Sequence, residues 1–156
     1  MTKELQVGDR APAFSMPRDG GGTISLDDLK GKSVVLYFYP RDDTPGCTKE
    51  AIAFTEFKSK FDRAGAKIIG VSRDTVAKHE KFIGKHDLKI ALGADEDGAV
   101  TEAYGVWKEK KNYGRVYMGI ERSTYLIDGD GVIREIWRKV KVATHAEAVL
   151  DAVKGL

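Results

Sequence analysis

The feature that most constrains the fold is an unbroken apolar run at residues 34–39, followed closely by a helix-start signal. Six apolar residues in succession indicate a strand that is covered on both faces. Thr44 is a good N-cap and Pro45 suits the first helical position, so a helix is predicted from there to about Asp62. A second buried strand is predicted at residues 68–72. Together these segments predict a strand-helix-strand unit.

The rest of the chain continues this alternation. Strands are predicted at 13–16, 23–26, 90–94, 123–128 and 132–138, and helical segments at 27–31, 75–86 and 98–104. A last helix, capped by Thr144, is also predicted, and its apolar stripe consists of Ala148, Val149, Ala152 and Val153. The polar, basic segment 108–113 indicates an exposed loop. No linker or repeat interrupts the chain. This order predicts one α/β domain over residues 1–156, with a thioredoxin-like fold, a central mixed sheet flanked by helices and an N-terminal β extension.

Charge and the first residues narrow the function classes. The chain carries 26 basic and 24 acidic residues, a net charge of +2, so no nucleic-acid partner is expected. Residues 1–6 are polar and no apolar signal region follows them. The longest apolar run is too short to cross a bilayer. We therefore expect a cytoplasmic protein with no membrane association.

The chain has a single cysteine, Cys47. An intrachain disulfide, a Cys-x-x-Cys redox pair and a cysteine-rich zinc site are thereby excluded. With Thr44 as N-cap, Cys47 is the third residue of a helix, near unpaired backbone N–H groups and the positive end of the helix dipole, which favour a thiolate over a thiol. The alternative is a core cysteine packed on the sheet together with Ala51 and Phe54. Spacing alone leaves both interpretations open.

Residues 38–51 closely resemble the active-site segment of peroxiredoxins, whose pattern Pro-x-x-x-(Thr/Ser)-x-x-Cys is met by Pro40, Thr44 and Cys47. The sequence of residues 42–50 is similar to that of the bacterioferritin-comigratory, or Q-type, branch. A second match, at 122–128, resembles the segment that holds the active-site arginine of the family. Short segments near both ends of the chain are also similar in sequence to this family, so the resemblance covers nearly the whole chain.

The resemblance implies a thiol-dependent peroxidase that reduces hydrogen peroxide and organic hydroperoxides through a sulfenic acid on Cys47. Thr44 would hydrogen-bond the sulfur and the peroxide, and Arg122 would hold the thiolate and stabilise charge on the leaving oxygen. Pro40 would shield the sulfur from water. The backbone N–H groups of Gly46 and Cys47 are further peroxide contacts, since donors aimed at developing oxyanion charge lower a barrier.

The implied site includes one supporting residue, Glu50, and neither a cofactor nor a metal. Glu50 is expected either to orient Arg122 or to be a solvated helix residue. The resemblance implies no cofactor and no metal. His79 and His86, seven residues apart on one helix, are too far apart for one metal without other ligands and are expected to be solvated or interfacial, and His145 to lie on the surface.

The sequence departs in one respect from the family that it resembles. Many relatives carry a resolving cysteine at the position of Ile52, and others carry one in the segment 82–85, but neither is present here. We therefore expect an external thiol to recycle Cys47: thioredoxin, glutaredoxin or a small thiol, or a second Cys47 in a transient dimer. A monomer or weak dimer is expected. The alternative function is a non-enzymatic thioredoxin-fold redox sensor or interaction module, which turnover with an added thiol would distinguish.

Overall fold

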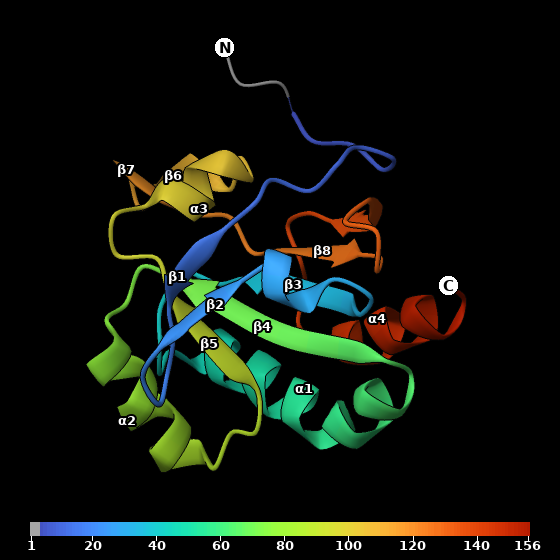
Figure 1. Cartoon of the computed structure of the whole chain (residues 1–156). Coiled ribbons are helices and arrows are strands. Elements are labelled where there is room, and N and C mark those ends of the chain that lie inside the picture. The colour runs from blue at the N-terminus through green and yellow to red at the C-terminus, as the bar shows by residue number, and fades with distance from the viewer. Residues whose placement is uncertain (1–3) are drawn as a thin grey trace.

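The computed structural model describes residues 4–156, and a central five-stranded sheet organises them (Figure 1). The strand order is β5-β4-β3-β8-β9. The bounds are β3 Ser33–Phe38, β4 Ala66–Ser72, β5 Ala91–Ala94, β8 Ser123–Ile127 and β9 Ile133–Trp137. Strand β3 pairs in parallel with β4 and antiparallel with β8, so the sheet is mixed, as the sequence predicted.

Helices and the N-terminal segment cover opposite faces of this sheet (Figure 1). One face packs against α1 Pro45–Arg63, α2 Val76–His86 and α4 His145–Lys154. The other packs against β1 Ser15–Pro17, β2 Thr23–Ser25 and α3 Ala99–Ala103. A single 3-10 turn at Asp27–Leu29 follows β2. The expected thioredoxin-like arrangement with an N-terminal β extension is confirmed.

The side chains of β3, and of Tyr39 directly after it, are divided between the two cores. Val35, Tyr37 and Tyr39 pack on the side of α1, whereas Val34, Leu36 and Phe38 pack on the opposite side. Each of the six is at most 1% exposed, which explains the unbroken apolar run. At roughly 1.5–3 kcal/mol for each fully buried apolar side chain, this strand anchors the fold. The segment that follows β3 therefore starts from a rigid base.

The prediction of an exposed loop at 108–113 was wrong. Strands β6 Trp107–Asn112 and β7 Arg115–Ile120 pair in an antiparallel hairpin of their own. Its two turn residues, Tyr113 and Gly114, have φ angles of 52° and 77°. Two positive φ values are typical of a tight hairpin turn that usually carries Asn-Gly or Asp-Gly. A tyrosine at the first turn position removed that signal, and the polar strands looked like a loop.

The last helix also differs from its prediction. Thr144 precedes it in a left-handed conformation and makes no capping bond through its side chain. The buried face consists of His145, Ala146, Val149, Leu150 and Val153, while Ala148 is exposed. The predicted stripe was therefore displaced around the helix by part of a turn. His145, expected on the surface, is only 6% exposed, because it packs under Trp137 and Phe54.

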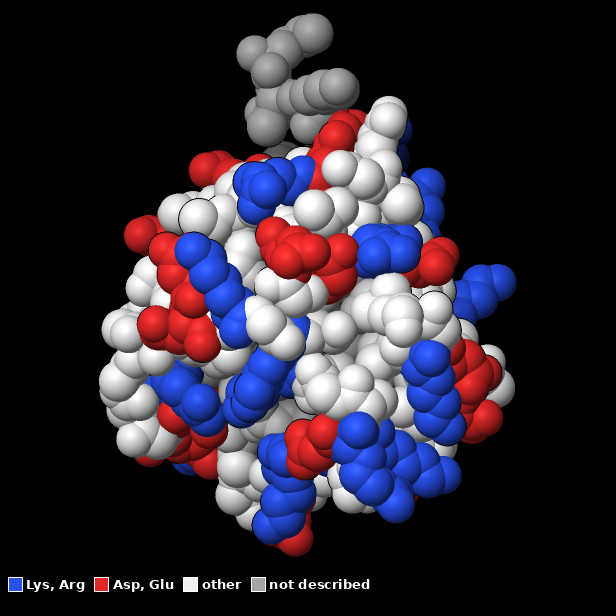
Figure 2. Space-filling model, turned by 45° about the vertical axis from the view of Figure 1, so that its right-hand side comes forward, with Lys and Arg blue, Asp and Glu red and all other residues white. Residues whose placement is uncertain are grey.

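Charge is distributed evenly over the face shown in Figure 2, where basic and acidic side chains alternate without a continuous basic area. Within residues 4–156, none of the helices is both long enough and apolar enough to span a membrane.

Candidate active site

Cys47 lies in the first turn of α1, at the end of the sheet where β3 finishes. The helix begins at Pro45, as predicted, with Thr44 in the extended conformation of an N-cap. This places Cys47 at the third helical position, on the face that packs against the sheet with Ala51 and Phe54. The residue is 1% exposed. Both sequence interpretations are thus partly met, since the cysteine is buried and also lies at the helix N-terminus.

Arg122 reaches the same place from a distant part of the chain. The register of β3 and β8 pairs Phe38 with Ser123, so Arg122, one residue before β8, stands at the edge where α1 begins. Its Nη2 donates to Cys47 Sγ at 3.4 Å, and its Nη1 donates to Glu50 Oε1 at 2.6 Å. The guanidinium therefore connects the sulfur to a carboxylate one turn further along α1.

Glu50 is a buried helix residue and not a solvated one. Glu50 is 1% exposed, and its second carboxylate oxygen, Oε2, has no hydrogen-bond partner among the described residues. Burial raises the pKa of Glu50 to about 7, although the Arg122 guanidinium acts in the opposite direction. For Arg122, burial works to lower the pKa, but Glu50 and then Cys47 outweigh it and raise the pKa. The pair holds a cation against the sulfur.

Thr44 occupies the N-cap position without capping. Its hydroxyl donates to the carbonyl oxygen of Arg41 at 2.9 Å and makes no capping bond to the helix. The first intrahelical bond runs from Thr48 N to Thr44 O. The N–H groups of Gly46 and Cys47 come before it, in the first turn, where a helix offers them no backbone acceptor. These two amides remain available to an incoming oxygen.

Pro40 and Gly46 belong to the segment that leads into the site. Pro40 lies two residues after the end of β3 and is exposed. A Cβ on Gly46 would lie 3.1 Å from Arg122 Nη2, closer than an ordinary van der Waals contact. Glycine at this position thus makes room for the guanidinium, a requirement that the sequence alone did not reveal.

Sequence reasoning missed two side chains near the sulfur. Tyr37 lies in β3 with a buried hydroxyl that has no partner among the described residues, and burial, then the charge of Glu50, raise its pKa well above the ordinary value. Lys110 lies on the unpredicted β6–β7 hairpin, where burial and then the charge of Arg122 lower its pKa while Cys47 raises it. Both effects place these groups within electrostatic range of the site.

His79 was also placed wrongly by the sequence, which predicted a solvated or interfacial residue. Its side chain is fully buried, with Nδ1 2.6 Å from Asp42 Oδ2. Its partner lies 37 residues away in the segment before α1, so no local pattern reported the contact. His86 is partly exposed and lies 2.9 Å from Asp43.

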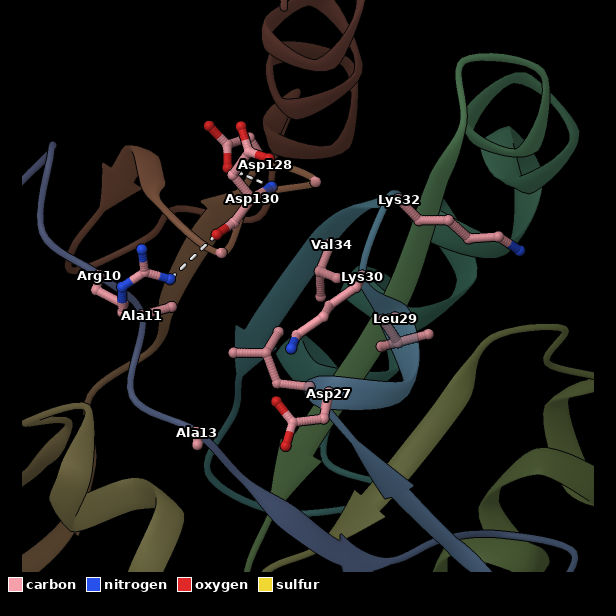
Figure 3. Close-up of a pocket in the computed structure, with 13 residues that line it drawn as sticks. Arg10, Ala11, Ala13, Asp27, Leu29, Lys30, Lys32, Val34, Asp128 and Asp130 are labelled. Atoms are coloured by element: carbon pink, nitrogen blue, oxygen red, sulfur yellow. Dashed lines mark hydrogen bonds between the residues drawn. The ribbon is translucent and has the colours of Figure 1, made fainter.

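Cys47 lines neither of two hollows that border β3 and the segment before α1. A hollow of about 170 Å³ at the opposite end of β3 is lined by Arg10, Lys30 and Asp128 among others, and none of the site residues named above contributes to it (Figure 3). An open groove of about 450 Å³ borders the segment before α1, between Arg41 and Lys81.

The arrangement has a definite chemical capacity. A buried sulfur lies 3.4 Å from a cation, in the first turn of a helix whose leading amides have no helical acceptor, so negative charge on the sulfur is stabilised where it develops. Since the chain has one cysteine, the sulfur forms no disulfide within the chain.

Comparison with known proteins agrees with this chemistry. The AhpC/TSA family model matches residues 7–136. A putative peroxiredoxin of Coxiella burnetii is 50% identical over 146 residues, which cover 94% of this chain and 97% of the relative. The peroxiredoxin Bcp of Bacillus subtilis is 48% identical over 152 residues, 97% of each chain.

Solved structures give the same result. A structure of the Xanthomonas campestris bacterioferritin comigratory protein, described in terms of its alkyl peroxide reduction activity, superposes with a TM-score of 0.87 at 46% identity, covering 91% of this chain and 90% of the other. A peroxiredoxin Q mutant from Xylella fastidiosa superposes with a TM-score of 0.93 at 37% identity, covering 98% of both chains.

Proposed function

This chain belongs to the AhpC/TSA family as a peroxiredoxin of the bacterioferritin-comigratory type, and from that premise we propose that Cys47 is the residue that attacks the peroxide. The protein is a thiol-dependent peroxidase. The observation that carries the assignment of Cys47 is its contact with Arg122, 3.4 Å from Nη2 to Sγ, in a guanidinium that Glu50 fixes from the other side.

The first chemical step is a two-electron displacement. The Cys47 thiolate attacks the terminal oxygen of the peroxide, an S–O bond forms and the O–O bond breaks. The sulfur is oxidised to sulfenic acid, and the peroxide is reduced to an alcohol, or to water in the case of hydrogen peroxide, once the leaving oxygen takes up a proton. Arg122 stabilises negative charge first on the sulfur and then on the leaving oxygen.

The remaining site residues hold the peroxide in line. Because Thr44 already donates its proton to Arg41, its hydroxyl oxygen accepts from the O–H of the bound peroxide. The unpaired N–H groups of Gly46 and Cys47 donate to the attacked oxygen. Pro40, at the end of β3, limits water near the sulfur once a peroxide is bound. Glu50 orients Arg122 and makes no contact with the peroxide.

An external thiol completes the cycle. It condenses with the sulfenic acid, releasing water and leaving a mixed disulfide with Cys47. A second thiol then attacks that disulfide, restoring the Cys47 thiol and releasing the oxidised reductant. Thioredoxin, glutaredoxin and small thiols all fit this role, and so does a second Cys47 through an intermolecular disulfide. Slow recycling exposes the sulfenic acid to further oxidation.

We place this activity in the cytoplasm, where a lone thiol is kept reduced. The working form in this proposal is a monomer or weak dimer.

Rapid trapping tests the assignment. Reduced protein is mixed with one equivalent of hydrogen peroxide, treated with dimedone and weighed intact within seconds, with Cys47→Ser as the control. The proposal requires rapid stoichiometric labelling of the wild type, none of Cys47→Ser and slow labelling of Arg122→Ala. A wild-type thiol that stays unmodified for minutes contradicts it.

A further inference from the structure

Building on the proposed function, we infer that His79 and Asp42 form a charged positioning pair that holds the segment before α1 in the shape needed for attack on the peroxide. Neither residue touches the sulfur or its substrate. They act through the backbone that carries Thr44 and the first turn of α1.

The pair lies inside the protein. The side chain of His79 is fully buried and that of Asp42 is 6% exposed. Asp42 Oδ2 lies 2.6 Å from His79 Nδ1, and Asp42 Oδ1 accepts from the Tyr39 hydroxyl at 2.5 Å. The other ring nitrogen, Nε2, lies 2.9 Å from the carbonyl oxygen of Gly93 in β5. All of these groups are therefore held by short polar contacts in a dry environment.

The acceptors that surround the two ring nitrogens of His79 decide the charge of the ring. The nearest oxygen to each ring nitrogen, Asp42 Oδ2 or the Gly93 carbonyl, only accepts, and a neutral imidazole has one N–H. The Tyr39 hydroxyl, 3.5 Å from Nδ1, donates its proton to Asp42 and not to the ring. Only the doubly protonated imidazolium donates to Asp42 and to Gly93 at once. Burial by itself lowers the pKa of His79, but Asp42, the Gly93 carbonyl and Asp74 outweigh it and raise the pKa. The ring charge and the geometry are thus consistent.

The groups around the ring come from three elements. The segment between β3 and α1 contributes Asp42 and the Tyr39 phenol, and the connection between β4 and α2 contributes Asp74. The contact from β5 is the Gly93 carbonyl oxygen. The charged ring is accordingly surrounded by carboxylates and oxygen acceptors.

Asp42 also fixes the backbone that leads to Cys47, through a contact with Asp74. The N–H of Asp42 donates to Asp74 Oδ2 at 2.8 Å, and Asp74 also accepts from the Ser72 hydroxyl at 2.7 Å. The next residue, Asp43, has a φ of 59°, a left-handed conformation that a non-glycine residue keeps only when its surroundings hold it. His79 and Asp74 thus hold the start of a strained segment whose end is the N-terminus of α1.

Loss of the ring proton removes this hold. Once His79 is neutral, one of its two contacts is without a proton and the carboxylate of Asp42 is without a countercharge. The segment loosens while the sheet and α1 remain folded. Attack on the peroxide then slows at alkaline pH, because a displacement of about 1 Å at a reacting group costs on the order of 100-fold in rate.

Stopped-flow tryptophan fluorescence measures the rate of Cys47 oxidation by hydrogen peroxide from about pH 6 to about pH 10, a range that covers the histidine titration. The wild type, His79→Gln and His86→Gln are compared. His86→Gln is the matched control, since it removes a partly exposed histidine from the same helix, while the glutamine amide can still donate to Asp43 and Lys85 keeps its own contact with that residue. We expect His79→Gln to be roughly 10- to 100-fold slower near neutral pH and to lack the alkaline decline. His86→Gln should stay within about 2-fold of the wild type and keep the decline.

A His79→Gln protein with the rate and the alkaline decline of the wild type overturns the inference. Should that variant not fold, ¹⁵N NMR of the wild-type imidazoles decides. Two ring protons on His79 at neutral pH, lost at the midpoint of the rate decline, support the pair, and a neutral ring there refutes it. A wild-type thiol that ignores peroxide at every pH refutes the proposed function instead. In that case, hydrogen exchange of the backbone amides at residues 42–47 tests whether protonated His79 fixes this segment. Exchange rates that do not change when His79 loses its proton overturn the inference.

Discussion

The guanidinium of Arg122 lies 3.4 Å from the sulfur of Cys47, although the two residues are 75 positions apart in the chain. The pairing of Phe38 with Ser123 brings them together, because it aligns the end of one strand with the start of its neighbour. The position of the cation is therefore set by the sheet and not by a flexible loop. Anything that displaces Arg122 should affect the reactivity of Cys47 before it affects stability.

Gly46→Ala should slow Cys47 oxidation about 10-fold or more, since the added Cβ would stand 3.1 Å from Arg122 Nη2 and push the guanidinium away from the sulfur. The helix itself should persist, because alanine is the better helix former. Stopped-flow oxidation rates and thermal unfolding of the same preparation check both statements.

Gly84→Ala is the matched control. Gly84 lies in α2, and a Cβ there would meet nothing within 4 Å. The oxidation rate should be unchanged, and stability should rise by about 0.5–1 kcal/mol. Equal rates for the two alanine variants would refute the steric argument for Gly46.

Glu50→Gln should change how stability depends on pH. Burial raises the pKa of Glu50 from its ordinary value of 4.5 to about 7, so the folded state holds a proton that the unfolded chain releases across this interval. The contribution of Glu50 is present below the lower value and lost as the pH rises through the higher one. Urea unfolding at about pH 5 and about pH 8 should show the wild type losing more stability than Glu50→Gln. An equal loss in both proteins would show that Glu50 does not titrate there.

His145 should act in the opposite direction. Its burial, with the nearby charge of Arg122, lowers its pKa from 6.5 to about 4, and its Nε2 lies 2.8 Å from the Thr124 hydroxyl. Between these two values the unfolded chain binds a proton that the folded state does not, so stability falls as the pH falls through the interval. Unfolding curves of the wild type should show this fall, and those of His145→Gln should lack most of it. A fall of the same size in the variant would assign it to other groups.

The oxidised protein should gain one oxygen atom in mass, without losing hydrogen, when one equivalent of peroxide is added in the absence of thiol. The chain has no second cysteine to close a disulfide with Cys47. Intact mass spectrometry reads this directly, and non-reducing electrophoresis detects any Cys47–Cys47 dimer. Repeated turnover should then appear only after a thiol is added. With excess peroxide and no thiol, consumption beyond the about three equivalents that carry Cys47 to the sulfonic acid would contradict the recycling scheme.

Sedimentation should show a monomer at low concentration and weak self-association at high concentration. The β6–β7 hairpin presents apolar side chains to solvent, among them Val116, 57% exposed, and Met118, 50% exposed. Such a hairpin edge favours pairing with another copy. Val116→Lys should reduce the association and leave the oxidation rate of Cys47 unchanged. A stable decamer would contradict this prediction.

Local signals predicted the part of the site that lies within one element. Thr44 and Pro45 placed the start of α1, and with it the position of Cys47, at the residue where the structure has it. The capping bond expected from Thr44 is absent, because the hydroxyl donates to Arg41. A residue type defines the helix boundary, but the bond it makes depends on its neighbours.

Contacts between distant segments were beyond local reasoning. Only the family resemblance brought Arg122 to Cys47, because no periodicity reports the register of β3 with β8. His79 was expected to be solvated or interfacial, and its burial was not foreseen because its partner Asp42 belongs to another segment. The hairpin that carries Lys110 was missed because Tyr113 occupies a turn position usually held by Asn or Asp.

The 1% exposure of Cys47 discriminates between its two reactants by size. We expect hydrogen peroxide to be small enough to reach the sulfur while the first turn of α1 stays folded, whereas a cysteine on a folded reductant has to reach the sulfur along the line of the new S–S bond. We therefore expect reduction by a folded protein to require unwinding of the turn around Cys47, and attack on the peroxide to require that turn intact. With a protein reductant, the frequency of that unwinding sets an upper limit on turnover, and the reduced sulfur is shielded from bulky electrophiles while it waits for peroxide.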